Sequence, residues 1–185
     1  MRLSHLYITP NSRNWAGYWM PIDHEPMTYP KPVKQPNSRY CFVCGLENPL
    51  GLHLHFYQTA PDEVTAEYIA PEHYQGYPGI LHGGITAAIL DEAVGRAFMG
   101  NDPQASNFMY TAELKVKYKK KVPIGQPLKI IGRRGKRLRW TAEATAEIYD
   151  AQGNLLASAT ALLVDVPNQI PAEELEQLGW KVYPD

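Results

Sequence analysis

The chain has 185 residues, of which 44% are hydrophobic and 20% charged, and its formal net charge is −1. This balance argues against a broadly basic nucleic-acid-binding protein or a membrane-surface protein, and no stretch approaches the length of an apolar membrane span. No charged segment followed by an apolar run opens the chain, so we expect a cytoplasmic protein. The length suggests one domain with an extension.

The first 40 residues differ in composition from the rest of the chain. Six prolines between residues 10 and 36 exclude a long helix or a central strand. Trp15 and Trp19 are too hydrophobic for a plain disordered tail. We expect residues 1–40 to form an irregular arm that packs on its own domain or on a neighbouring subunit.

The two cysteines, Cys41 and Cys44, form a Cys-x-x-Cys run. Such a pair can be redox-active, bind a metal or be two thiols near a turn. His53 and His55 behind it complete a formal zinc pattern, but on a strand two residues at i and i+2 lie well apart along it. The spacing favours a turn before a strand, with both histidines on its polar face, and we expect no metal site.

From residue 51 onward, hydrophobic and polar residues alternate in short runs. The pattern predicts strands over 52–57, 64–68, 108–118, 128–134, 140–148 and 154–166. Such alternation indicates an antiparallel sheet with one covered face. Six alanines on the inner positions of the last two strands leave room for a helix close to the sheet: Ala142, Ala144, Ala146, Ala157, Ala159 and Ala161.

Residues 85–99 predict a helix that is hydrophobic almost all round, which is typical of a buried helix. Glu92 precedes Arg96 by four residues, the favourable spacing for a helical ion pair. Asp91 has only small or hydrophobic residues three and four positions away. Because an unpaired buried carboxylate is costly, either a residue elsewhere in the fold satisfies Asp91 or it is a functional acid, base or nucleophile.

His82, Gly83 and Gly84 stand directly before this helix. The glycines let the backbone turn and come close to a ligand. The first N–H groups of a helix have no partner inside it and carry the positive end of its dipole, which suits stabilisation of an oxyanion. The alternative is a glycine-rich connection with a core histidine.

With these residues the chain resembles the hotdog-fold acyl-CoA thioesterases of the PaaI-like and 4-hydroxybenzoyl-CoA thioesterase group. The resemblance rests on Gln75-Gly76, Gly79, His82-Gly83-Gly84 and Asp91, and it covers about residues 40–166. Further matches are residues 44–52, 111–114 and 118–123. It implies an α+β fold in which an antiparallel sheet wraps around a long central helix. The hotdog domain is then residues 41–168, followed by a tail, 169–185, with a possible short helix at 172–179.

The resemblance also implies hydrolysis of an acyl-CoA to free acid and thiol, without a cofactor, between the subunits of a dimer or a dimer of dimers. Asp91 would act as general base or nucleophile. The backbone N–H of Gly83 or Gly84 of the partner protomer would polarise the thioester oxygen, and His82 would fix the loop or the thioester. Family members often carry Asn or Gln six residues before the histidine; here Gly76 takes that position, beside Gln75.

Other residues are candidates for binding the substrate. The resemblance assigns Gln75, Gly76 and Thr111 to this role. For the coenzyme A phosphates we expect Lys121 and Arg133, which belong to the main basic concentration of the chain, residues 119–121 and 133–139. The alternative is that these basic residues are solvated strand edges that discourage aggregation.

Two other functions compete with hydrolysis. A non-catalytic hotdog module would bind an acyl ligand or act as a scaffold through its arm. A hotdog hydratase typically places an Asp before a His in a loop that enters the helix, whereas here His82 comes first and Asp91 lies deep in the helix. We therefore favour the thioesterase, with no nucleic-acid or membrane partner.

Overall fold

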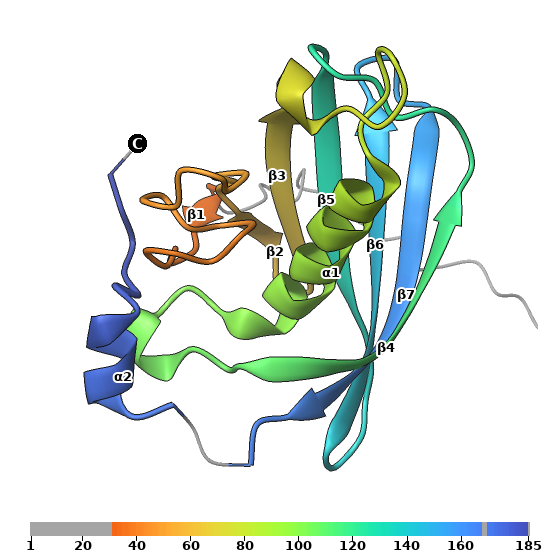
Figure 1. Cartoon of the computed structure of the whole chain (residues 1–185). Helices are drawn as coiled ribbons and strands as arrows, with labels where there is room; N and C mark the ends of the chain where they lie inside the picture. The colour runs from red at the N-terminus through yellow and green to blue at the C-terminus, as the bar shows by residue number, and fades with distance from the viewer. Residues whose placement is uncertain (1–30, 168–169, 185) are drawn as a thin grey trace, which may run out of the picture.

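The computed structural model describes residues 31–167 and 170–184. Its strands form one antiparallel sheet in the spatial order β1-β2-β3-β5-β6-β7-β4, and the long helix α1 (Gly83–Met99) lies across one face of that sheet (Figure 1). The strands are β1 (Val33–Lys34), β2 (Tyr57–Ala60), β3 (Glu63–Ile69), β4 (Met109–Tyr118), β5 (Pro127–Arg137), β6 (Thr141–Asp150) and β7 (Leu155–Asp165). Short 3₁₀ turns occupy Glu72–Tyr74 and Pro103–Ala105, and α2 spans Ala172–Gln177. The predicted α+β hotdog architecture is confirmed.

The core lies between α1 and the sheet. All six alanines predicted to face the helix are buried, as are Ile89, Leu90 and Val94 of α1. Gly132 of β5 brings the helix closest to the sheet, because a Cβ at this position would collide with the carbonyl group of Ala93. Small side chains on the sheet therefore set how near α1 can approach, as the alanine pattern predicted.

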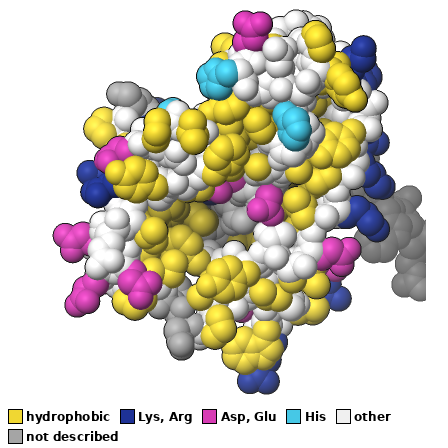
Figure 2. Space-filling model, viewed as in Figure 1, with side chains coloured by type: hydrophobic (Ala, Val, Ile, Leu, Met, Phe, Trp, Pro, Cys, Tyr) yellow, Lys and Arg dark blue, Asp and Glu magenta, His cyan; other side chains and the backbone are white. Residues whose placement is uncertain are grey.

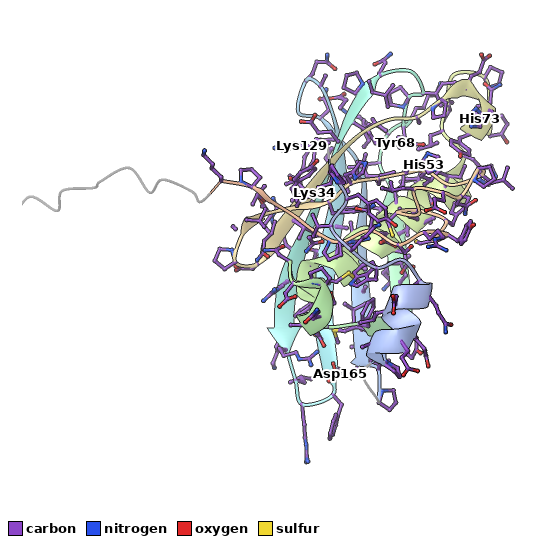
Figure 3. All side chains as sticks on the ribbon, turned by 90° about the vertical axis from the view of Figure 1, so that its left-hand side faces the viewer. Lys34, His53, Tyr68, His73, Lys129 and Asp165 are labelled. Carbon is purple, nitrogen blue, oxygen red and sulfur yellow. The ribbon has the colours of Figure 1, made fainter. Side chains whose placement is uncertain are left out.

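Residues 52–56 alternate in burial as predicted but form no strand, so the expected strand over 52–57 is wrong. Leu52 and Leu54 bond their N–H groups to the carbonyls of Phe42 and Val43, and β2 begins only at Tyr57. His53 is exposed and has a φ of 56°, in the left-handed region (Figure 3). Alternation reports which side chains are buried; it does not show that the backbone pairs as a strand.

Strand β4 lies at one edge of the sheet and pairs with β7. A bulge between Thr111 and Glu113 shifts its register, which breaks the predicted alternation. Tyr110, Thr111 and Glu113 are exposed. Among residues 31–167 and 170–184, no strand pairs with the other edge of β4.

The segment before β2 packs against α1. Arg96 is fully buried between the rings of Phe56 and Trp180, at 5.2 and 5.1 Å from its guanidinium carbon. Gln35, which the sequence assigned to the arm, is buried and donates to the carbonyl of Arg96. The folded unit therefore begins before residue 41. The expectation for residues 1–30 lies outside the described residues.

The tail forms the predicted short helix, and it joins the core through Trp180, whose Nε1 donates to Ser106 Oγ at 2.9 Å. Within residues 31–167 and 170–184, the structure has no helix with the length and hydropathy needed to cross a membrane.

Candidate active site

The His82-Gly83-Gly84 turn forms the start of α1. His82 is the N-cap residue, and its Nδ1 accepts the N–H of Gly84 at 3.0 Å. A neutral imidazole that accepts at Nδ1 carries its proton on Nε2. The Gly84 N–H is therefore already used, whereas the N–H of Gly83, the first helical residue, has no partner inside the helix. Of the two donors that the sequence left open, the Gly84 N–H bonds to the His82 ring, and the Gly83 N–H has no partner inside the helix.

Three hydrogen bonds hold this turn in place. Tyr118 at the end of β4 donates from its hydroxyl to the Gly83 carbonyl at 2.8 Å. The N–H of Leu81 bonds to the Val122 carbonyl, and the N–H of His82 to the Tyr74 carbonyl. Tyr118 was not among the predicted site residues; its position at the start of the 118–123 match was the signal that could have found it.

A pocket of about 620 Å³ opens beside the turn. It brings together four of the predicted residues, Gly76, His82, Gly83 and Lys121, with Tyr118. Its other lining residues are Tyr77, Ile80, Leu81, Thr86, Lys119, Lys120 and Val122. A glycine loop and three consecutive lysines thus share one cavity, an arrangement suited to a ligand with an anionic part.

Gln75 lies next to this cavity and supports its loop, because its Oε1 accepts the N–H of Gly79 at 3.3 Å. The remaining predicted substrate residues lie elsewhere. Arg133 is on the outer side of β5 and pairs with Glu63 at 3.0 Å and Glu147 at 2.6 Å. Thr111 is near the end of β4 opposite Tyr118. One subunit does not bring Arg133 or Thr111 into the pocket.

The two carboxylates in the middle of α1 have different environments. Glu92 accepts from Arg96 Nε at 2.7 Å, so the predicted ion pair is present. Asp91 is half-buried, and its Oδ1 is buried without a hydrogen-bond partner among residues 31–167 and 170–184. Within the described part of the chain, no residue donates a hydrogen bond to this buried oxygen.

Asp91 lies on a stripe of small residues along α1. Ala87, Ala88 and Gly95 are half-buried, and a Cβ built on Gly95 would meet no atom of the described residues within 4 Å. The side of the molecule on which α1 lies in Figure 1 is hollowed, with hydrophobic and acidic side chains around the hollow (Figure 2). This helix face has space for another group to approach.

The Gly83 N–H and the Asp91 carboxylate are separated along α1. Eight residues at about 1.5 Å each place them roughly 12 Å apart along the helix axis. Both groups would have to lie about 3 Å from a reacting carbonyl to act on it together. One helix therefore cannot supply both groups to the same substrate.

Comparison with known proteins relates the chain to thioesterases. Residues 78–157 match the model of the thioesterase superfamily. The chain is 27% identical over 149 residues to mouse acyl-coenzyme A thioesterase THEM4, covering 76% of this chain and 60% of that protein. Rat THEM4 is 30% identical over 95 residues, 51% of this chain and 39% of that protein. The chain thus spans between about two fifths and three fifths of the length of these relatives.

Solved structures share the fold. A thioesterase superfamily protein, RHA08564, has a TM-score of 0.63 at 28% identity, covering 69% of this chain and 61% of that one. The protein smu.793 from Streptococcus mutans UA159, solved with acetyl-CoA bound, has a TM-score of 0.51 at 20% identity, covering 57% and 82%. Together with the fold described above, these matches show that the chain has the hotdog fold and that residues 78–157 are similar to the thioesterase superfamily.

Proposed function

We propose that this protein hydrolyses acyl-CoA thioesters to a free acid and coenzyme A, at sites that two subunits build together. The unsatisfied Asp91 Oδ1 in the middle of α1 carries the proposal, because an unpaired carboxylate in a folded helix needs a role that offsets its desolvation. The THEM4 relatives are acyl-CoA thioesterases, and a structural neighbour binds acetyl-CoA, which supports this substrate class.

Gly83 and Asp91 have complementary roles in the reaction. The Gly83 N–H of one subunit donates to the thioester oxygen and stabilises the negative charge that develops there. Asp91 of the other subunit either accepts a proton from the attacking water or attacks the carbonyl itself. The C–S bond then breaks, and the thiolate leaves without a strong general acid. If Asp91 is the nucleophile, water then hydrolyses the acyl–Asp91 anhydride, which releases the free acid and restores the carboxylate. His82 orients the donor by holding the Gly84 N–H.

The open edge of β4 is the surface we assign to subunit pairing. Along the edge of this ten-residue strand that faces away from β7, the described part of the chain supplies no neighbouring strand, and such an edge can pair with a strand of another chain. In an antiparallel pairing with a two-fold axis near the middle of the strand, Thr111 of one subunit lies close to Tyr118 of the other. Thr111 would then reach the pocket from across the interface.

The lysines beside the turn are the proposed site for the coenzyme A phosphates. Lys119, Lys120 and Lys121 line the same cavity as Gly83. Lys120 already donates to Asn154 at 3.1 Å, so Lys119 and Lys121 are the better candidates. Ammonium groups form charge-assisted hydrogen bonds with phosphate oxygens.

The direct test is Asp91→Asn, assayed by chromatographic release of coenzyme A from a panel of short, long and aromatic acyl-CoA substrates. Loss of the proposed catalytic carboxylate should lower kcat by roughly 10²- to 10⁴-fold. Asp62→Asn is the matched control, since Asp62 is exposed in the turn between β2 and β3. Equal rates for wild type and Asp91→Asn, or tight acyl-CoA binding with no hydrolysis by the wild type, would disprove the proposal.

A rapid-quench mass spectrum of the α1 peptide separates the two roles of Asp91. An acyl adduct on Asp91 during turnover identifies the nucleophile. An unmodified peptide throughout the first turnover identifies the general base.

A further inference from the structure

A second cluster of reactive groups lies one residue from Asp91. The Cys41–Cys44 turn packs against α1 at Glu92, and the two sulfur atoms and a Glu92 carboxylate oxygen all lie within 4.8 Å of one another. Cys41 Sγ is 3.7 Å from Glu92 Oε2. Cys44 is buried, and Cys41 and Glu92 are half-buried. The proposed hydrolysis uses none of these three side chains.

The backbone of this turn is arranged around the Cys41 sulfur. The N–H of Cys44 donates to Cys41 Sγ at 3.4 Å, and the N–H of Gly45 closes the turn on the Cys41 carbonyl at 2.8 Å. Gly45 is required here, because a Cβ would collide with the Cys41 backbone. Backbone donors directed at sulfur favour the thiolate, which is the form that binds metals.

The charges of the cluster also leave room for a cation. Two thiolates and the Glu92 carboxylate would bring three negative charges, and Arg96 supplies one positive charge. Arg96 Nε bonds to Glu92 Oε1, so Oε2 is the oxygen that faces Cys41. Charges removed from water must be paired or bound to a metal, and a divalent cation would bring this group to neutrality.

We propose that Cys41, Cys44 and Glu92 bind one divalent cation of the zinc class, with water as the fourth ligand. Zinc–sulfur bonds of about 2.3 Å place two tetrahedral sulfurs about 3.8 Å apart, and the two sulfurs here lie within 4.8 Å of each other. Thiolates are soft ligands that select zinc over calcium or magnesium. The ion would tie the segment before β2 to the middle of α1, a structural role separate from the hydrolysis.

These proposed ligands differ from the zinc pattern in the sequence, which combines the two cysteines with His53 and His55. Glu92 takes part in place of the histidines, because among residues 31–167 and 170–184 the cluster around the two cysteines contains Glu92 and no histidine. His53 is exposed, with its Nε2 2.6 Å from the Asn48 carbonyl. The substitution His53→Gln is therefore the matched control.

The test measures metal directly on the full chain, purified under reducing conditions without chelator. We expect about one zinc per chain by elemental analysis. After chelator treatment, added Co²⁺ should produce the near-ultraviolet charge-transfer band of thiolate ligation. Cys41→Ser and Cys44→Ser should abolish that band, and Glu92→Gln should weaken zinc binding at least as much as the roughly 10- to 100-fold loss caused by removing an outer-shell partner. His53→Gln should bind like wild type.

Several results would overturn this proposal whether or not the protein is a thioesterase. One is a reduced wild type that takes up no zinc or cobalt; another is a Cys41→Ser protein that gives the wild-type titration. A loss of binding in His53→Gln would point to the other ligand set. A chain whose mass is lower by two hydrogens and that binds no metal would show that Cys41 and Cys44 form a disulfide instead of a metal site. If Cys44→Ser fails to fold, as circular dichroism would show, the half-exposed Cys41 and Glu92 variants still decide the question.

Discussion

Tyr118 and Gly83 are 35 residues apart in sequence, and the Tyr118 hydroxyl donates to the Gly83 carbonyl at 2.8 Å. This bond joins the end of the edge strand β4 to the first residue of α1. The bond fixes Gly83 through its carbonyl group, while the N–H of Gly83 has no partner within the helix. Tyr118 is therefore a positioning residue for the proposed oxyanion donor.

Gly83→Pro tests that donor without disturbing the helix. Proline lacks an N–H, and its fixed φ suits the first helical position. His82 before it already has the extended backbone that proline requires, with ψ at 134°, and a Cβ at position 83 would meet the Tyr118 ring at an ordinary 3.7 Å. We expect kcat to fall by roughly 10²- to 10³-fold at unchanged thermal stability. A folded variant with wild-type kcat would exclude Gly83 as the donor.

Lys121→Gln tests the proposed phosphate contact. Losing an exposed charge beside the pocket should raise KM for acyl-CoA about fivefold, equivalent to about 1 kcal/mol, with little change in kcat. The difference from wild type should shrink as salt is added, since exposed charges are screened. Lys136→Gln, also exposed on β5 but not among the pocket residues, is the control. Equal KM shifts in both variants would indicate a general charge effect.

Gly132→Ala and Gly95→Ala should change stability in opposite directions. The methyl group added by Gly132→Ala would collide with the Ala93 carbonyl, and we expect a loss of about 1–3 kcal/mol in the free energy of unfolding. Gly95 is helical with open space around it, so alanine should add about 0.5–1 kcal/mol through helix propensity. Urea unfolding measures both. A tolerated Gly132→Ala would mean that α1 lies farther from β5.

Cys41 should react with iodoacetamide at unusually low pH in the reduced, metal-free protein. The hydrogen bond from the Cys44 thiol lowers the pKa of Cys41 to about 7, whereas the same hydrogen bond and burial raise the pKa of Cys44. A lowered pKa keeps the thiolate populated as the pH falls, so the alkylation rate should rise through pH 7 and level off above about pH 8. Peptide mapping should find Cys44 unmodified. A rate that still climbs steeply above pH 8 would contradict this assignment.

Local pattern predicted much of the architecture. The alternation of hydrophobic residues predicted most of the strands, and the run of hydrophobic residues predicted the buried helix. The helical spacing of four residues predicted the Glu92–Arg96 pair. Three features depend on contacts between distant segments and were missed. The Cys41 turn meets Glu92 across 51 residues; His53 adopts a left-handed backbone; and a bulge after Thr111 alters β4.

The candidate site shows the same division. His82, Gly83 and Lys121 line one pocket, where the N–H of Leu81 bonds to the Val122 carbonyl. The glycine motif pointed to His82 and Gly83, and the basic run at 119–121 pointed to Lys121. Sequence could not assign the Gly84 N–H to the His82 ring, because that choice depends on a side-chain rotamer. It also could not show that Arg133 already pairs with Glu63 and Glu147 on the outer side of β5.

The spacing of Gly83 and Asp91 on a single rigid helix has a consequence for mixed assemblies. If each reaction centre takes its donor from one chain and its carboxylate from the other, a hybrid of one Asp91→Asn chain and one Gly83→Pro chain contains one centre with both defects and one with neither. Two inactive preparations would then regain turnover when dissociated and reassociated together. Dilution that separates the chains would abolish turnover and leave each chain folded.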